Sequence, residues 1–246
     1  MKTKLLFLSF LIAASALTAF AQSVVVSPKK VVYTRKVKDT PKEKMTLQVT
    51  YPTISGAISP VVKKKLEDTI SFWRVFETTL EENLGDNYWL SELSYTVNYN
   101  KNGILDIALA QEGVGAYPDG QTVDLVVDLK TGAQIKFADV FKAELSEKLA
   151  RLANSKLAIE KAKSLKEVGT ASGEEKDSQR QQINDLKFTV EDLKEFSVGD
   201  KGVTFIYDAG FPHVIQALEP AGKYFFSWSE LKPFIRRDGL LVRFVR

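Results

Sequence analysis

The chain has 246 residues, and 44% of them are hydrophobic, a proportion typical of globular proteins with a packed core. Its 34 basic residues exceed its 31 acidic ones by only three, an excess too small to indicate nucleic-acid binding. Since the sequence contains no cysteine, a disulfide framework, a thiolate metal site and a cysteine nucleophile are excluded.

The N-terminal 21 residues have the three-part layout of a secretory signal peptide. Lys2 and Lys4 precede an apolar run over residues 5–17. Small residues follow at Ala19 and Ala21. We expect cleavage after Ala21 and a periplasmic or secreted protein. Because no later segment approaches the ~20 consecutive apolar residues of a membrane helix, no membrane insertion is expected after cleavage.

Alternating apolar residues after this leader predict a first strand pair over residues 24–37 and 45–51. Ser59 and Pro60 then supply a helix N-cap and a proline at the first helical position. Apolar residues recur at three- and four-residue spacing through Leu84, and a glycine follows. This pattern predicts one long helix from Pro60 to Leu84.

The centre of the sequence predicts a sheet with one buried face. Residues 100–103 are typical of a hairpin turn. Apolar residues alternate with polar or small ones over 105–109 and again over 123–129, as in a half-buried, mainly antiparallel sheet. Asp106 and Asp124 have the opposite parity in these two strands, so we expect both carboxylates to face water.

A second long helix and a polar segment come next. The helix is predicted from Ala143 to about Lys163. Its expected buried stripe consists of Leu145, Leu149, Leu152 and Leu157. Residues 164–182 contain few large apolar side chains, and this composition predicts an exposed polar loop.

The C-terminal part returns to strands. Residues 196–207 and 224–228 have strand patterns, and Ser227 with Glu230 fits a capping box that opens a short helix. A last strand is predicted over 240–245. The order of elements predicts an α+β fold, in which two long helices and a short C-terminal helix pack on a mainly antiparallel sheet.

Five short motifs follow one another along the chain. They are Tyr51-Pro52 to Gly56 ahead of a helix, Gly115 to Pro118, Val127 to Gly132, Asp139 to Phe141, and Gly202 to Phe205 leading to Trp228 to Leu231. In this order they resemble the secreted module of lysozyme-sensing anti-sigma factors of the RsiV type, which is similar to the non-catalytic part of peptidoglycan deacetylases of the PdaC type. Where this family often has a histidine, the chain has Tyr117.

The resemblance implies a domain plan and a class of function. Residues 1–21 form the signal peptide, and 22–246 form a single RsiV/PdaC-like α+β domain with its exposed polar loop at about 164–182. The family implies binding at the cell envelope rather than catalysis. The expected partner is a cell-wall glycan or a lysozyme-like protein.

The residues offer little for catalysis. Segment 204–210 faintly resembles the acidic motif of metal-dependent polysaccharide deacetylases. These enzymes also need two metal-binding histidines, and His213 is the only histidine in the sequence. A Ser-His-Asp triad would also need His213, but the sequence has no nucleophile-elbow motif. We therefore expect no catalytic residue, no metal and no cofactor.

The glycine-rich connection over residues 113–120 is the candidate ligand-binding segment, because loops on a rigid sheet are where function is usually placed. A strand connection in which glycine permits a bulge is the alternative. The aromatics Tyr88, Trp89 and Trp228 are interpreted as core residues, with a sugar-stacking platform as the alternative. The candidate binding residues are Gly113, Gly115, Tyr117, Pro118 and Asp119.

Two functions from different classes follow. The first is a non-catalytic binding module for a peptidoglycan-type glycan or a lysozyme-like protein. The second is a cell-wall glycoside hydrolase, which would need a pair of carboxylates with one pKa raised beside a cleft. The acids available for such a pair are Glu112, Asp119, Asp124 and Asp128.

Overall fold

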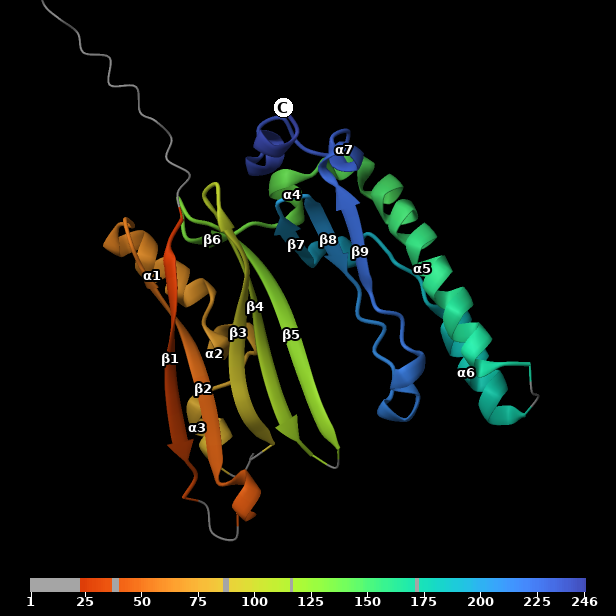
Figure 1. The fold of residues 1–246 in the computed structure, drawn as a ribbon, viewed down its shortest axis with the longest axis horizontal. Helices are drawn as coiled ribbons and strands as arrows, with labels where there is room; N and C mark the ends of the chain where they lie inside the picture. Colours follow the sequence, from red (N-terminus) through yellow and green to blue (C-terminus); the bar gives the residue numbers. More distant parts are fainter. Residues whose placement is uncertain (1–22, 37–39, 86–88, 116, 171–172) are drawn as a thin grey trace, which may run out of the picture.

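The computed structural model describes residues 23–36, 40–85, 89–115, 117–170 and 173–246. The expected signal peptide and Tyr88 lie outside these residues. The fold is α+β, as predicted, with strands arranged in two sheets (Figure 1). No helix in the described part of the chain is long and apolar enough to cross a membrane.

The larger sheet has six strands in the order of the sequence. Neighbouring strands are antiparallel except for a short parallel pairing between the second and third. The strands are β1 (Val25–Thr34), β2 (Thr46–Ser55), β3 (Leu90–Lys101), β4 (Ile104–Val114), β5 (Pro118–Asp128) and β6 (Ala133–Gln134).

The β3–β4 and β4–β5 connections of this sheet are hairpins, and the backbone geometry of the first explains its turn residues. Asn102 and Gly103 form the β3–β4 turn with φ of 55° and 72°, a left-handed pair that an Asn-Gly sequence accommodates with little strain. In the β4–β5 hairpin, Val114 pairs with Pro118. The predicted connection over 113–120 is therefore mostly strand, and only 115–117 lie between β4 and β5.

Three short helices cover one face of the larger sheet, where a single helix was predicted. They are α1 (Pro60–Thr69), α2 (Phe72–Val75) and α3 (Leu80–Leu84). The breaks follow local backbone geometry and capping. Ser71 is extended at the N-cap position of α2, Glu77 has a φ of 49°, and Thr79 forms a capping box with Glu82. The core between these helices and the sheet contains Leu66, Phe72, Leu93, Ile107 and Val127.

The smaller sheet contains β7 (Phe196–Gly199), β8 (Gly202–Ile206) and β9 (Lys223–Ser227), all antiparallel. Its outer face packs on α5 (Ser146–Val168), and α6 (Glu174–Asp185) lies against α5 (Figure 1). The stripe that α5 buries contains Leu149, Ala153 and Leu157. Leu152 lies about 120° from the centre of this stripe and is 40% exposed, so its predicted burial is wrong.

The polar segment 164–182 differs from its prediction as an exposed loop. α5 continues to Val168, and α6 includes residues 174–182. Val168 and Ile183 are buried together with Phe211 in a small apolar cluster. A few apolar anchors at the right positions are enough to fix a polar helix against its neighbours, and composition does not show them.

The remaining elements are short. The predicted last strand over 240–245 is instead a 3₁₀ helix, and its Leu241 is fully buried in the core of the smaller sheet. The capping box of Ser227 and Glu230 opens a helix as predicted. These elements are α4 (Phe137–Val140), α7 (Trp228–Leu231), η1 (Lys42–Lys44), η2 (Ala143–Leu145), η3 (Glu191–Lys194), η4 (His213–Leu218) and η5 (Leu240–Phe244).

The two sheets meet at one end and separate at the other. β7 lies against β3 and β5, and the face of the larger sheet that lacks helices is turned toward the smaller sheet (Figure 1). At the end where the sheets meet, here called the contact end, Ile104 and Val126 of the larger sheet belong to the apolar core of the smaller sheet. The candidate site lies between the β4–β5 hairpin of the larger sheet and η4.

Candidate ligand-binding site

An exposed aromatic pair joins the β4–β5 turn to η4. The rings of Tyr117 and His213 are stacked, with centroids 4.8 Å apart and planes 18° apart. Tyr117 remains 60% exposed, and His213 is also exposed. The two residues are 96 positions apart in the sequence (213 − 117), so the fold brings two distant segments together at a surface that solvent reaches.

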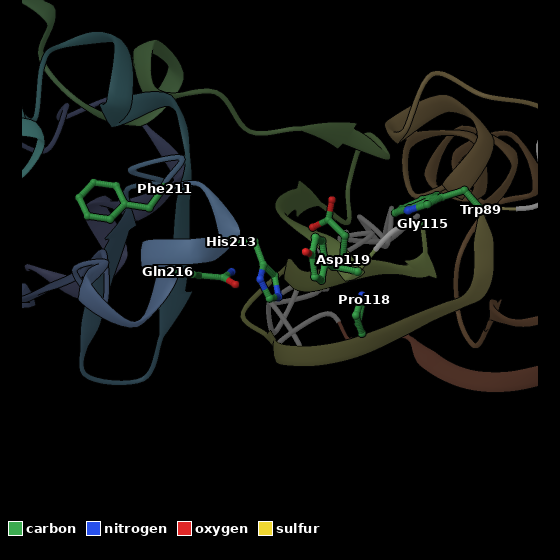
Figure 2. A pocket seen from close by; sticks show the side chains of 8 residues that line it. Trp89, Gly115, Pro118, Asp119, Phe211, His213 and Gln216 are labelled. Carbon is green, nitrogen blue, oxygen red and sulfur yellow. The ribbon is translucent and has the colours of Figure 1, made fainter. Parts of the chain in front are cut away.

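A pocket of about 320 Å³ opens beside this pair. Figure 2 shows His213 and Gln216 entering from the η4 side, opposite Gly115, Pro118 and Asp119 of the β4–β5 hairpin. Four of the five predicted binding residues therefore line one pocket. The complete lining is Trp89, Gly115, Tyr117, Pro118, Asp119, Phe211, His213 and Gln216.

Gly113, the fifth predicted residue, is buried and does not line this pocket. A Cβ atom at this position would lie 2.4 Å from the carbonyl oxygen of Trp89 and 2.8 Å from its indole ring. The same carbonyl oxygen accepts a hydrogen bond of 2.9 Å from the Val114 amide. Gly113 thus makes room for Trp89 beside the hairpin, and it borders a second, shallower depression next to Asp119 and Gln216.

Trp89 was predicted to be a core residue, and it has two roles. Its ring packs against the core under the helices while also lining the pocket. Trp228, the other described aromatic considered as a platform, stacks on Phe244 with centroids 4.4 Å apart. Its indole N–H donates a 3.0 Å hydrogen bond to the Asp200 carbonyl. Trp228 therefore packs as predicted, and it is not among the residues that line the pocket.

The η4 side of the pocket is held by one buried ring. Phe211 is only 7% exposed and packs with Val168 and Ile183. In Figure 2 its side chain points away from His213, into the body of the smaller sheet's layer. Gly210, with a φ of 64°, turns the chain ahead of it. This anchor presents His213 and Gln216 to the hairpin, and no sequence signal links them to it.

A polar groove continues between the sheets beyond the pocket. It has a volume of about 340 Å³, and strands of both sheets supply its walls. Four of its nine lining residues carry hydroxyls, and one amide, one carboxylate and one ammonium group are also present. The residues are Thr96, Asn98, Ala108, Thr122, Asp124, Ser197, Thr204, Ile206 and Lys223.

Asp106 of β4 is fully buried where β7 covers the larger sheet, so the prediction that it faces water is wrong. Its Oδ1 accepts a 2.9 Å hydrogen bond from Asn98 Nδ2, and its Oδ2 accepts one from the Val198 amide of β7. Burial raises the pKa of Asp106 to about 6, against the opposing effect of these hydrogen bonds. The smaller sheet covers this residue, which the alternation within one strand does not reveal.

Asp124 faces the open part of the groove. Asn98 Nδ2 donates its other hydrogen to Asp124 Oδ1 at 2.9 Å, so one amide holds both carboxylates. Burial raises the pKa of Asp124, while the positive charge of Lys223 lowers it. Among the described residues no ion pair within 4 Å joins Asp124 and Lys223, so they face each other across the groove without direct contact.

The other acids considered for a hydrolase are dispersed. Asp128 accepts hydrogen bonds of 2.9 Å from the Lys130 amide and the Thr131 hydroxyl within the turn after β5. Asp119 accepts a 2.8 Å hydrogen bond from the adjacent Gly120 amide at the pocket. Asp106, the acid with the strongly raised pKa, is fully enclosed. Burial also raises the pKa of Asp124, which faces the groove, whereas Asp106, with the stronger rise, is enclosed.

Comparison with known proteins identifies the fold. No protein-family model and no curated protein matches the chain. A solved DUF3298 family protein from Bacteroides fragilis matches with a TM-score of 0.62 and 12% identity, covering 92% of this chain and 98% of that one. Another DUF3298 family protein, from Pseudomonas aeruginosa PAO1, matches with a TM-score of 0.53 and 13% identity, covering 89% and 97%. At these identities the likeness shows a shared fold alone, and the resemblance to RsiV and PdaC rests on sequence motifs.

Proposed function

We propose that the chain is a non-catalytic binding module of the cell envelope, and that it holds a peptidoglycan-type glycan in the pocket beside Tyr117 and His213. The observation that carries this proposal is the exposed stack of these two rings above a pocket that Trp89 also lines. The signal-peptide layout and the motif resemblance support an envelope location, periplasmic or secreted.

The physical match between this pocket and a sugar is direct. A sugar ring presents C–H faces that pack on aromatic rings and a rim of hydroxyls that form hydrogen bonds. Tyr117 and Trp89 supply ring surface, and Asp119 and Gln216 supply polar atoms at the edge of the same pocket. Because Tyr117 is fixed by its stack on His213, less side-chain entropy is lost when a ligand packs against it.

The alternative is the cell-wall glycoside hydrolase. The observations in its favour are the raised pKa values of two neighbouring carboxylates, Asp106 and Asp124. Of the two, Asp124 alone lines the groove. A general acid must reach the glycosidic oxygen, and both oxygens of Asp106 are enclosed and hydrogen-bonded. We therefore favour binding, and expect no release of reducing sugar when the protein is incubated with peptidoglycan.

Co-sedimentation with purified peptidoglycan tests the proposal. The mature protein should pellet with the insoluble glycan, and Tyr117→Ala should weaken the binding about tenfold or more, since an aromatic anchor contributes on the order of 1–3 kcal/mol. Ile159→Ala is the matched control, because Ile159 is 73% exposed on α5 and does not line the pocket. It should bind like the wild type.

A second pair of variants tests the stack itself. His213→Phe keeps a flat ring against Tyr117 and should retain most of the binding, whereas His213→Ala removes the support and should lose much of it. Immobilised lysozyme provides the other arm. Capture by lysozyme but not by peptidoglycan, with the same loss in Tyr117→Ala, would show that the ligand is a protein and would overturn the glycan proposal.

A further inference from the structure

The pocket and the polar groove lie end to end along one face of β5. Pro118, Gly120, Thr122 and Asp124 alternate on this face. Pro118 lines the pocket, Gly120 lines the adjoining depression, and Thr122 and Asp124 line the groove. Six residues of strand extend about 20 Å, so a ligand that starts at Tyr117 and continues along β5 meets the groove next.

The groove is prepared to receive a hydrogen-bond donor on its larger-sheet side. Both amide hydrogens of Asn98 are donated to carboxylates, to Asp106 and to Asp124. The amide oxygen of Asn98 therefore remains to accept a hydrogen bond from a ligand, and the Asp124 carboxylate can accept further hydrogen bonds. Because Asp106 is buried and fixed by the Val198 amide, the position of Asn98 is fixed as well.

The smaller-sheet side offers the opposite chemistry. Lys223 is a donor without acceptor capacity, and it faces Asp124 across the groove without forming an ion pair among the described residues. A ligand that presents a hydrogen-bond donor to Asp124 and an acceptor to Lys223 complements both groups, and an N–H with a carbonyl oxygen supplies such a pair. A secondary amide has these two groups on adjacent atoms.

The rest of the lining decides which secondary amide fits. Four hydroxyl side chains surround the gap, which suits a ligand that itself carries hydroxyl groups at several positions. They belong to Thr96, Thr122, Ser197 and Thr204. The aromatic pair at the pocket, further along β5, also suits a ring with C–H faces. Together these features favour an amino sugar over a peptide.

We propose that the groove recognises the acetamido group of an N-acetylated amino sugar, with the amide N–H donated to Asp124 and the carbonyl oxygen accepting from Lys223. This inference rests on the proposed glycan binding at Tyr117 and names the sugar class that the site selects. Asn98 is the positioning residue that holds the Asp124 carboxylate toward the ligand.

Two oligosaccharides that differ in one substituent test the proposal. The β-1,4-linked tetramers of N-acetylglucosamine and of glucose have the same backbone, and only the first carries acetamido groups. Calorimetric titration of the mature protein should give at least tenfold tighter binding for the N-acetylglucosamine tetramer. Lys223→Met should reduce this preference to about threefold or less.

Lys130→Met is the matched control, because Lys130 is an exposed lysine in the turn after β5 and does not line the groove. It should keep the full preference. Asp124→Asn should lower the preference as Lys223→Met does. Far-ultraviolet circular dichroism and the melting temperature should be close to those of the wild type for all three variants, since each changes a side chain at the surface or in the open groove.

Four results would overturn the inference, and they differ in what survives. Equal affinity for both tetramers, lost in Tyr117→Ala, would leave the proposed glycan binding intact but remove the acetamido site. A preference retained in Lys223→Met would place acetamido recognition elsewhere. Tighter binding of an N-acetylated dipeptide than of either tetramer, lost in Lys223→Met, would assign the groove to peptides. Failure of both tetramers and of peptidoglycan to bind would refute the proposed function itself.

Discussion

The two faces of β4 are covered by different parts of the fold. Leu105, Ile107 and Leu109 are each fully buried against the core under α1, α2 and α3. The residues between them, Asp106 and Ala108, face the smaller sheet. One face of the strand packs in the hydrophobic core, and the other lines a groove between the two sheets.

The second face also changes along its length. At the contact end it is apolar and closed, where Ile104 and Val126 join the core of the smaller sheet. Further along, this face becomes polar at the buried Asp106. Around Ala108 and Thr122 it is lined by small and hydroxyl side chains. An alternating strand therefore predicts one buried face, whereas what covers its other face depends on residues far away in the sequence.

The largest expected contrast in stability comes from introducing serine at two adjacent positions of β4. Ile107→Ser removes a fully buried side chain and buries a hydroxyl, and it should destabilise the protein by roughly 4–5 kcal/mol. Ala108→Ser adds one hydroxyl to the groove and should change stability by about 0.5 kcal/mol or less. Urea unfolding measures both values. Similar destabilisation by the two variants would show that the two faces are packed alike.

Asp106 should make stability depend on pH. Its pKa of about 6 in the folded protein exceeds the ordinary value of about 3.9 for an unfolded aspartate. Between pH 4 and pH 6 the folded state therefore binds more protons than the unfolded state, and the free energy of unfolding falls as pH rises. Two pKa units correspond to about 3 kcal/mol, lost by about pH 6.

Asp106→Asn tests this account, because asparagine does not titrate. Urea unfolding at half-unit intervals from pH 4 to pH 7 should show a much shallower fall in the variant than in the wild type. The remaining slope should include a contribution of the same sign from Asp124, whose pKa is also raised by burial. An unchanged slope in Asp106→Asn would assign the pH dependence to other groups.

Two glycines of the hairpin should differ in a smaller but measurable way. Gly113→Ala places a methyl group 2.4 Å from the Trp89 carbonyl oxygen, so the backbone or the indole must move, at a cost of about 1–3 kcal/mol. Gly115→Ala places it 3.5 Å from the same side chain, an ordinary contact, and should cost less than about 0.5 kcal/mol. Thermal unfolding of both variants checks this. Equal melting temperatures would show that Gly113 is not needed for Trp89.

Tyr117→Ala should have the smallest effect on stability, under about 0.5 kcal/mol, because the ring is 60% exposed and its stacking partner is exposed as well. Its melting temperature should stay within two to three degrees of the wild type. A drop of several degrees with unchanged peptidoglycan binding would identify Tyr117 as a packing residue.

Local chemistry was readable from the sequence. The Asn102-Gly103 turn, the buried parity of Ile107 and the capping box at Ser227 are each set by residues within a few positions. The candidate segment was found for the same reason, since glycines and an aromatic side chain in a strand connection are a local signal. Four of its five chosen residues line one pocket.

Long-range packing was not readable. The burial of Asp106 depends on β7, which is about 90 residues further along the chain. The pairing of Tyr117 with His213 depends on Phe211 and its buried partners in α5 and α6. Periodicity shows which side chains share a face, but it contains no information on which distant element covers that face.

Tryptophan fluorescence during titration with the N-acetylglucosamine tetramer tests the central claim most directly. Of the tryptophans, Trp89 lines the pocket, while Trp73 and Trp228 pack against the two cores. We predict a saturable change in emission that persists in Trp73→Phe and Trp228→Phe and is lost in Trp89→Phe. A saturable change that persists unaltered in Trp89→Phe would show that the sugar binds elsewhere and would contradict the account.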